Sequence, residues 1–310
     1  MTFSTEFPHS FGDALKMVRK VLSANHELVK KGVVETESEQ IVAAAYRTVS
    51  GKLLTRAEIL FRHGDPIPPE VGKKALIFAM SRAEGKLLQH VTGVQVFLGH
   101  EYEVGPSVLV PRPETEVLAA RAIELLGKLT QPPRLGIEIG VGSGVLSIEL
   151  LAHFSGLMML ASELTEEAET CAMKNARKIL GVDADTRLTV LRAREALSVW
   201  QPFEQRGIRG TADFVISNPP YLLQADSIEK DVLTQEPATA LFAPVGDPLH
   251  FYREVAQHGK EYLRPGGFVF LEMPTERAGL IGDLFRKHGW NPEIVPDLAQ
   301  RQRVLVGRQH

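Results

Sequence analysis

The sequence predicts an α/β fold, in which a parallel sheet is covered by helices on both faces, together with a separate helical domain before it. Short apolar runs recur along residues 112–310, and stretches with helical spacing separate them. Alternation of this kind is typical of a parallel sheet. Residues 1–92 show helical spacing and turn signals instead, so we expect them to form a helical bundle.

Helix signals recur within the first predicted domain. Apolar residues stand at helical spacing at Leu15, Val18 and Leu22. Thr36 and Thr55 each precede a glutamate by three positions, which is the pattern of a capping box at the start of a helix. Both patterns predict short helices that share one core.

The end of this domain leads into a different pattern. A proline-rich turn precedes a last predicted helix over residues 70–88. Residues 93–111 alternate in polarity and contain glycines, so we expect a β-hairpin that links the two domains.

The second predicted domain, residues 112–310, supplies the strands. The expected strands are 135–139, 157–162, 188–191, 214–217 and 268–272, and the expected helices include 145–153 and 166–180.

Asn218-Pro219-Pro220-Tyr221 follows the apolar segment 213–217 directly. Each proline fixes its own φ and lacks a backbone donor, so Asn218 should be held stiffly at a strand end. The side-chain oxygen of Asn218 and the carbonyl of Pro219 can then accept the two N–H bonds of a planar NH2 group, and the Tyr221 ring can pack on it. Orientation of this kind favours methyl transfer to a planar nitrogen. The alternative interpretation is a proline-rich turn that ends a strand.

A glycine-rich segment, Gly140-Val141-Gly142-Ser143-Gly144, follows the predicted strand 135–139 and precedes a predicted helix. Its glycines let backbone N–H groups approach a ligand at a helix N-terminus. Glu163, at the end of the next predicted strand, stands where a carboxylate accepts hydrogen bonds from ribose hydroxyls. These residues predict a nucleoside site. The glycines alone leave a nicotinamide enzyme open, and their combination with the Asn-Pro-Pro-Tyr motif favours a methyl donor.

The composition excludes several classes of protein. Of the 310 residues, 44% are hydrophobic, which is enough for sizeable cores. The single cysteine, Cys171, excludes an internal disulfide and a cysteine-based zinc site, and the ten histidines show no metal-ligand spacing. The chain has 35 basic and 38 acidic residues, so we expect no direct binding of nucleic acid. Without an export signal or about 18 uninterrupted apolar residues, we expect a cytoplasmic protein that uses no membrane and no metal.

Further motifs resemble those of a known family. Residues 108–116 read Val-Leu-Val-Pro-Arg-Pro-Glu-Thr-Glu, and residues 88–93 read Leu-Gln-His-Val-Thr-Gly. Glu236-Pro237 and Arg301-Gln302-Arg303-Val304 follow later. In these motifs, from about residue 37 to the C-terminus, the chain resembles the S-adenosylmethionine-dependent N5-glutamine methyltransferases. The Arg-Pro-Glu-Thr-Glu form is similar to the branch that acts on release factors.

The resemblance implies a fold, a cofactor and a substrate. The fold would be the Rossmann-like methyltransferase fold, a mostly parallel seven-stranded sheet with a reversed last strand at 303–306. The cofactor would be S-adenosylmethionine. The substrate would be a protein, the glutamine of the Gly-Gly-Gln loop of a peptide-chain release factor, which acts in translation termination. The helical domain would dock that substrate.

The chain departs from the family at one cofactor contact. Arg194-Glu195 stands where the family has an acidic residue followed by an aromatic one, and because arginine cannot accept a hydrogen bond, Glu195 is the candidate for the adenine contact. The candidate cofactor-binding residues are Gly140, Val141, Gly142, Ser143, Gly144, Glu163, Glu195 and Asn218. The candidate substrate-binding residues are Asn218, Pro219, Pro220 and Tyr221, of which Asn218, Pro219 and Tyr221 are the candidate catalytic residues.

We therefore expect a protein-(glutamine-N5) methyltransferase. Two alternatives keep the chemistry and change the substrate: a glutamine of a ribosomal protein, or adenine N6 in a nucleic acid, which is also a planar NH2 group. The helical N-terminal domain has no basic, aromatic-rich region, which argues against a nucleic-acid substrate. An alternative of another class is a degenerate binding protein that has lost cofactor contacts at Arg194.

Overall fold

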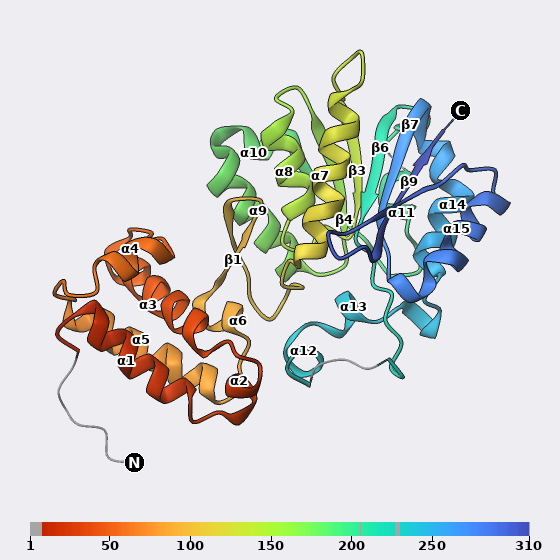
Figure 1. Cartoon of the computed structure of the whole chain (residues 1–310). Helices are drawn as coiled ribbons and strands as arrows, with labels where there is room; N and C mark the ends of the chain where they lie inside the picture. Colours follow the sequence, from red (N-terminus) through yellow and green to blue (C-terminus); the bar gives the residue numbers. More distant parts are fainter. Residues whose placement is uncertain (1–7, 205, 227–229, 310) are drawn as a thin grey trace. The chain divides into compact units, whose positions relative to one another are not determined.

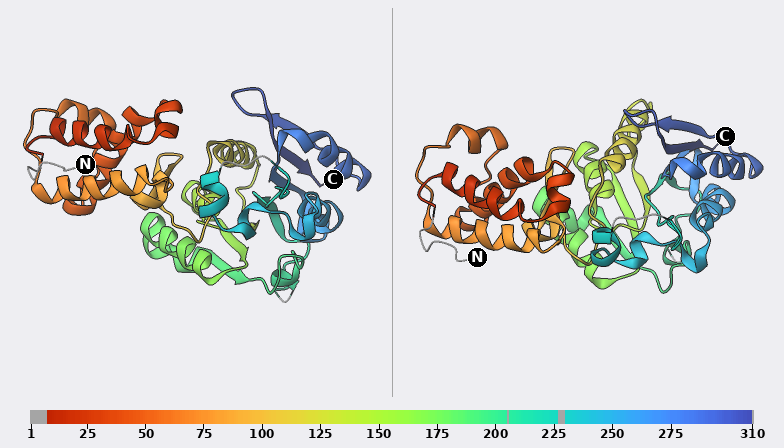
Figure 2. Two further views of the ribbon diagram at one scale, coloured as in Figure 1. Left: turned by 90° about the horizontal axis from the view of Figure 1, so that it is seen from below. Right: turned by 60° about the horizontal axis from the view of Figure 1, so that its bottom comes forward.

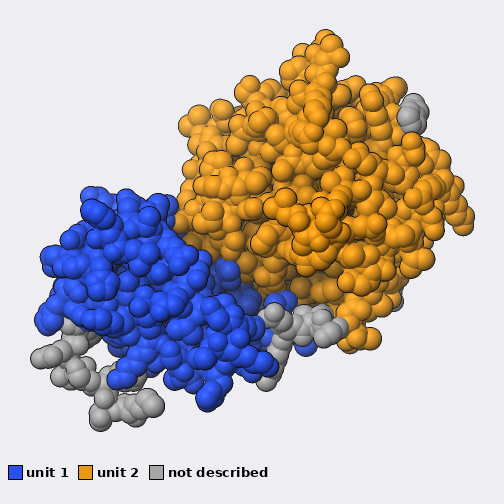
Figure 3. All heavy atoms as spheres, in the orientation of Figure 1, with its two compact units in different colours: residues 1–93, 229–235 blue, residues 94–228, 236–310 orange. Residues whose placement is uncertain are grey.

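The computed structural model describes residues 8–204, 206–226 and 230–309, and it divides the chain into two compact units. Unit 1 comprises residues 1–93 and 229–235, and unit 2 comprises residues 94–228 and 236–310 (Figure 3). The N-terminal residues 1–7, on which the expectation of no export signal partly rests, lie outside the described residues. Along the described part of the chain, no helix combines the length and apolarity needed to cross a bilayer.

The division differs from the expected one in two details. The hairpin expected to link the domains belongs to unit 2, and a short segment from the second half of the chain belongs to unit 1. This segment is the helix α12 (Lys230–Gln235), whose Gln235 side chain donates to the Gly85 carbonyl and accepts from the Leu87 N–H, both at 2.8 Å. The expected role of the helical domain in docking the substrate stays a prediction.

Unit 1 is a bundle of helices (Figure 1). Besides α12 it contains α1 (Phe11–Leu22), α2 (His26–Lys30), α3 (Val34–Ser50), α4 (Arg56–Phe61), α5 (Pro69–Ala83) and α6 (Leu88–Thr92). Their apolar faces share one core, which includes Phe11, Leu15, Ile41 and Ala75. The buried Arg82 of α5 donates to both carboxylate oxygens of Glu37 of α3, at 2.7 and 2.9 Å. Such a two-bond pair fixes how α5 packs on α3.

Helix boundaries in unit 1 confirm one capping box and correct other expectations. Thr55 and Glu58 exchange the two bonds of a capping box at the start of α4, as expected. The box expected at Thr36 is wrong, because Thr36 lies inside α3, which has no side-chain cap bond at its start. The helix expected over 70–88 ends at Ala83, and α6 is a separate helix.

Unit 2 contains a seven-stranded sheet in the order β5-β4-β3-β6-β7-β9-β8. Its strands are β3 (Leu135–Ile139), β4 (Met158–Glu163), β5 (Leu188–Arg192), β6 (Ala212–Ser217), β7 (Leu263–Glu272), β8 (Glu293–Pro296) and β9 (Gln302–Arg308). The pairs from β5 to β7 are parallel, and β9 runs antiparallel to both β7 and β8. The predicted fold class, a mostly parallel seven-stranded sheet with a reversed last strand, is confirmed.

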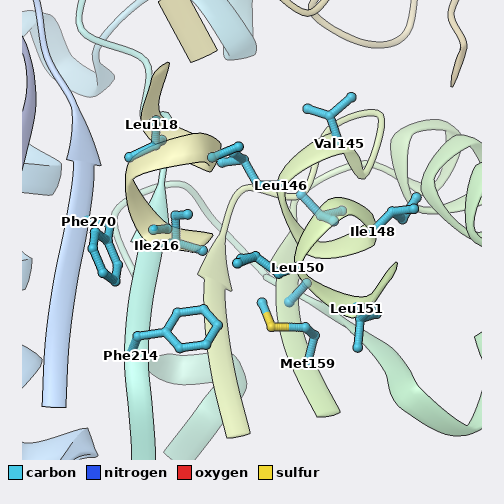
Figure 4. Packing of buried hydrophobic residues seen from close by; sticks show 14 of the residues in the cluster. Leu118, Val145, Leu146, Ile148, Leu150, Leu151, Met159, Phe214, Ile216 and Phe270 are labelled. Carbon is cyan, nitrogen blue, oxygen red and sulfur yellow. The ribbon is translucent and has the colours of Figure 1, made fainter. Parts of the chain in front are cut away.

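Helices cover both faces of this sheet (Figure 2). The helices of unit 2 are α7 (Pro113–Gly127), α8 (Val145–His153), α9 (Glu166–Leu180), α10 (Ala184–Arg187), α11 (Gln201–Glu204), α13 (Ala238–Leu241), α14 (His250–Tyr262) and α15 (Ala278–Lys287), with short 3-10 turns at Gly181–Asp183, Pro244–Gly246 and Thr275–Arg277; all the α-helices except α13 contribute to the cores on the two faces. Residues of α7, α8 and α9 fill one core, to which Leu118, Leu150 and Phe214 belong (Figure 4). Residues of α14 and α15 fill the core on the other face.

A hairpin of β1 (Val94–Phe97) and β2 (His100–Glu103) opens unit 2. Leu98 and Gly99 form its two-residue turn with φ values of 45° and 86°, the conformation that such tight hairpins need. The buried Tyr102 hydroxyl donates to Glu149 of α8 at 2.7 Å, which ties the hairpin to the α/β core. The expected hairpin is therefore present but ends at Glu103.

Candidate active site

A cavity lies in unit 2 where β3, β4, β5 and β6 end. The carboxyl ends of parallel strands are where α/β sheets bind ligands. The cavity is lined by the predicted site residues Gly140, Val141, Gly142, Ser143, Glu163, Glu195, Asn218, Pro219 and Pro220. The structure thus brings most of the predicted cofactor and substrate residues to one place, although they come from the ends of four separate strands and the loops after them.

The three glycines after β3 have two different roles. All three have positive φ, at 76° for Gly140, 53° for Gly142 and 88° for Gly144. A Cβ added to Gly140 or Gly142 would meet no atom within 4 Å, so both leave open space beside the cavity. A Cβ on Gly144 would come within 2.8 Å of Ile148 and 3.3 Å of Ala172. Gly144 does not line the cavity, and it allows close packing of α8 on α9 instead of touching a ligand.

Glu163 ends β4 with its carboxylate in the cavity wall. Oε2 accepts from the Gly142 N–H at 2.9 Å, and Oε1 accepts from the Leu164 and Thr165 N–H groups at 2.6 and 3.3 Å. A carboxylate offers about four acceptor positions, and these three bonds leave one of them, on Oε2. The backbone therefore fixes the Glu163 carboxylate and leaves it one position for a ligand hydroxyl.

Glu138 of β3 is fully buried at the back of the cavity. Its Oε2 accepts from the Ser147 N–H at 3.0 Å and from the Ser147 hydroxyl, in the first turn of α8. The start of a helix favours a carboxylate, but burial dominates and raises the pKa of Glu138 to about 8.

Asn218 stands where β6 leads into the cavity. Its side-chain Nδ2 donates to the Thr115 hydroxyl at 3.1 Å, and that hydroxyl donates to Glu272 Oε2 at 2.7 Å. Thr115 and Glu272 are both buried, and the burial of Glu272 raises its pKa to about 7. Pro219 and Pro220 continue the cavity wall after Asn218.

Tyr221 departs from its expected position. Its ring packs on the core between the sheet and α14, and it is not among the residues that line the cavity. Its carbonyl accepts from Arg277 at 3.5 Å, and burial raises the pKa of its phenol. Tyr221 is therefore not part of the cavity wall, and the expected packing of its ring on the target group stays a prediction.

Comparisons with known proteins decide the family. The release factor glutamine methyltransferase of Bacteroides thetaiotaomicron is 36% identical over 241 residues, which cover 76% of this chain and 79% of that protein. The protein of the same name from Neisseria gonorrhoeae is 31% identical over 256 residues, 82% of this chain and 88% of that protein. No protein-family model matches the chain.

The chain belongs to the release factor glutamine methyltransferase family. The resemblance drawn from its motifs is thereby confirmed, and so is the expectation that the chain is an enzyme of the methyltransferase class. Among solved structures, the release factor-specific protein-(glutamine-N5) methyltransferase of Alicyclobacillus acidocaldarius is 24% identical, covers 67% of this chain and 99% of that chain, and has a TM-score of 0.40.

The family motif at 108–116 supplies the part of the cavity that residue-by-residue reasoning missed. Val108, Leu109, Pro111 and Thr115 line the cavity, together with Thr239 and Ala240 of α13 and Phe251 of α14. The buried Glu236 holds this segment in place, since it accepts from the Val110 N–H at 2.7 Å and pairs with Arg112. The motifs at 108–116 and 236–237 mark these residues in the sequence, but neither motif predicts that the two segments contact each other.

The cavity residues fit a cofactor that carries a nucleoside. Glu163 keeps an acceptor position for a hydroxyl, and Gly140 and Gly142 leave room beside it. Leu164, Ala193, Ala196 and Val199 line the cavity with apolar surface, which suits a flat base. Glu195 lines the same region, whereas Arg194 faces a separate hollow with Arg192 and Arg206.

Replacement of the buried Glu138 by glutamine should stabilise the fold at high pH. The folded pKa of about 8 lies above the ordinary value of 4.5, so the folded state binds the proton more tightly than the unfolded state. Wild-type stability should therefore fall as the pH rises from about 4.5 to about 8. Denaturant unfolding should show Glu138→Gln more stable than wild type by about 1–3 kcal/mol near pH 9, and by much less near pH 5.

Glu167→Gln is the matched control, because Glu167 is exposed in the first turn of α9. Its stability difference from wild type should stay flat over the same pH range. A Glu138→Gln variant whose stability relative to wild type does not increase as the pH rises would contradict the assignment of a buried, unfavourable charge.

Proposed function

We propose that this chain transfers a methyl group from S-adenosylmethionine to the side-chain amide nitrogen of a glutamine in the Gly-Gly-Gln loop of a peptide-chain release factor. One observation carries the proposal: Asn218 and Pro219 line the same cavity as Gly140, Gly142 and Glu163. An acceptor pair for an NH2 group thus adjoins a nucleoside site. The names of the relatives support the choice of substrate.

The cofactor side of the cavity would hold S-adenosylmethionine by its ribose and base. The free position on Glu163 Oε2 would accept from a ribose hydroxyl, and Glu195 would accept from the adenine amino group. Gly140 and Gly142 would leave room for the rest of the molecule. When bound, S-adenosylmethionine supplies a methyl group on a positively charged sulfur.

The substrate side of the cavity would orient the glutamine amide. An amide nitrogen is a poor nucleophile because its lone pair is delocalised, so the enzyme gains most by fixing its direction. The Asn218 side-chain oxygen would accept one N–H bond of the target, and the Pro219 carbonyl would accept the other. The nitrogen becomes strongly acidic once it is alkylated, so its proton can leave to water and no general base is needed.

A parallel assay tests the substrate. The purified chain receives labelled S-adenosylmethionine together with a release factor, a ribosomal protein or DNA in separate reactions. We expect label in the release factor, on the glutamine of its Gly-Gly-Gln loop as mapped by mass spectrometry. Label in the ribosomal protein or in DNA alone would overturn the proposed substrate, and no label in any reaction would overturn the proposed activity.

Asn218→Ala should separate binding from catalysis. It removes one acceptor for the target amide and leaves Glu163 and the glycines untouched, so kcat should fall by about a hundredfold or more. The dissociation constant of S-adenosylmethionine, measured by calorimetry, should change little. The control Asn291→Ala removes an exposed amide of unit 2 and should keep the wild-type kcat. A near-normal kcat for Asn218→Ala would show that the Asn-Pro-Pro-Tyr motif has only a structural role.

Substitutions at Arg194 and Glu195 test the adenine contact. Glu195→Ala should weaken S-adenosylmethionine binding by about 1–3 kcal/mol, since it removes a charged hydrogen-bond acceptor from the cavity. Arg194→Ala, at the neighbouring position outside the cavity lining, is the matched control and should bind normally. If Arg194→Ala weakens binding more than Glu195→Ala does, the cofactor contact lies at Arg194.

A further inference from the structure

A buried chain of hydrogen bonds behind Asn218 joins three distant parts of unit 2. Thr115 lies in the first turn of α7, Glu272 ends β7, and Asn218 follows β6. The Thr115 hydroxyl donates to Glu272 at 2.7 Å and accepts from Asn218 Nδ2 at 3.1 Å. Thr115 is 2% exposed and Glu272 is 3% exposed. The bond between Thr115 and Glu272 is therefore shielded from water, and the bond from Asn218 is partly shielded.

The chemistry of the three groups sets the direction of the chain. An ionised carboxylate can only accept, so the one hydroxyl proton of Thr115 is committed to Glu272. The Thr115 oxygen then has only lone pairs to offer, and Asn218 must turn its NH2 group toward it. Within the described residues, no protein donor is bonded to the Asn218 oxygen. That oxygen is left to accept from a ligand.

We propose that Thr115 and Glu272 are positioning residues for methyl transfer: they lock the Asn218 amide so that its oxygen, and not its NH2 group, meets the target nitrogen. The inference rests on the proposed function, because it assumes that Asn218 accepts from an amide N–H. Without these bonds, the Asn218 amide could rotate by a half-turn. Its NH2 group would then face the NH2 group of the substrate, and both groups are hydrogen-bond donors. The substrate amide would then be repelled instead of oriented.

Other contacts hold the lock in place. Pro113 is the first residue of α7, where its fixed φ suits the helix. It therefore helps to fix where the helix begins and where Thr115 lies. The Tyr252 hydroxyl of α14 donates to the Glu272 carbonyl at 2.9 Å and holds the strand end. α7 and α14 both pack on the sheet, so Thr115, Glu272 and Asn218 keep their positions relative to one another.

The charge state of Glu272 controls the direction of the lock. Burial, and to a smaller extent the Glu114 carboxylate, raise the pKa of Glu272, which is about 7 once all its neighbours act on it. The Thr115 hydroxyl and the guanidinium groups of Arg303 and Arg112 lower it. The phenols of Tyr221 and Tyr252 also lie close to this carboxylate. A protonated Glu272 can donate to Thr115, which frees the Thr115 proton and permits the reversed Asn218 amide. The locked form therefore predominates above about pH 7 and is lost as the pH falls through that value.

Single-turnover methyl transfer to a release factor tests the proposal. Thr115→Val keeps the shape and removes the hydroxyl, so the rate constant should fall about tenfold or more, with S-adenosylmethionine affinity within about twofold of wild type. Thr115→Ser keeps the hydroxyl and should restore most of the rate. The control Thr275→Val removes a hydroxyl that donates to the Gln302 carbonyl, near the end of β7, and should match wild type.

The pH dependence of the methyl-transfer rate gives a second test, because a purely structural role of Glu272 would leave it unchanged. The wild-type rate should decline below about pH 7, and Glu272→Gln should be slower and lose this decline. A wild-type rate for Thr115→Val, or an unchanged acid decline in Glu272→Gln, would overturn the proposal. So would Thr115→Ser as slow as Thr115→Val. If Thr115→Val fails to fold, Thr115→Ser and the pH profile of Glu272→Gln decide. A wild-type enzyme that does not label the release factor overturns the proposed function itself.

Discussion

Parallel pairing of β3, β4, β5 and β6 is the constraint on which the rest of the site depends. Strands that run in one direction end at one edge, so the loops that follow them meet there. Each loop brings one part of the chemistry: room from the glycines, an acceptor from Glu163, a further acceptor from Glu195, and the amide of Asn218. The sheet therefore brings the proposed nucleoside site and the proposed amide site to one cavity.

Three buried carboxylates fix the walls around that edge. Glu138 meets the first turn of α8, Glu272 meets the first turn of α7, and Glu236 holds the segment before α7. Burial raises the pKa of each, so each carries a cost in stability at high pH. In exchange, acceptor-only groups give a definite direction to the hydrogen bonds around them. The direction of the Asn218 amide is one consequence.

The sequence predicted the elements whose signals are local. β3, α8 and α9 match their expected bounds, because a short apolar run, a glycine segment and a regular helical spacing each define them. β8 was missed, since its four residues include a charged residue and a proline and are stabilised by pairing with β9. Most of the candidate site was also predictable, because its residues lie at strand ends. The position of Tyr221 and the contact of Thr115 with Glu272 were not, because they depend on packing between elements that are far apart along the chain.

A double-mutant cycle on Thr115 and Asn218 tests the central claim most directly, because it measures whether the two residues act as one unit. The cycle compares single-turnover rate constants of Thr115→Val, Asn218→Ala and the double variant with wild type. If Thr115 acts through the Asn218 amide, adding Thr115→Val to Asn218→Ala should slow the enzyme no further. Rate losses that multiply in the double variant would show that Thr115 acts independently of Asn218, and would contradict the account.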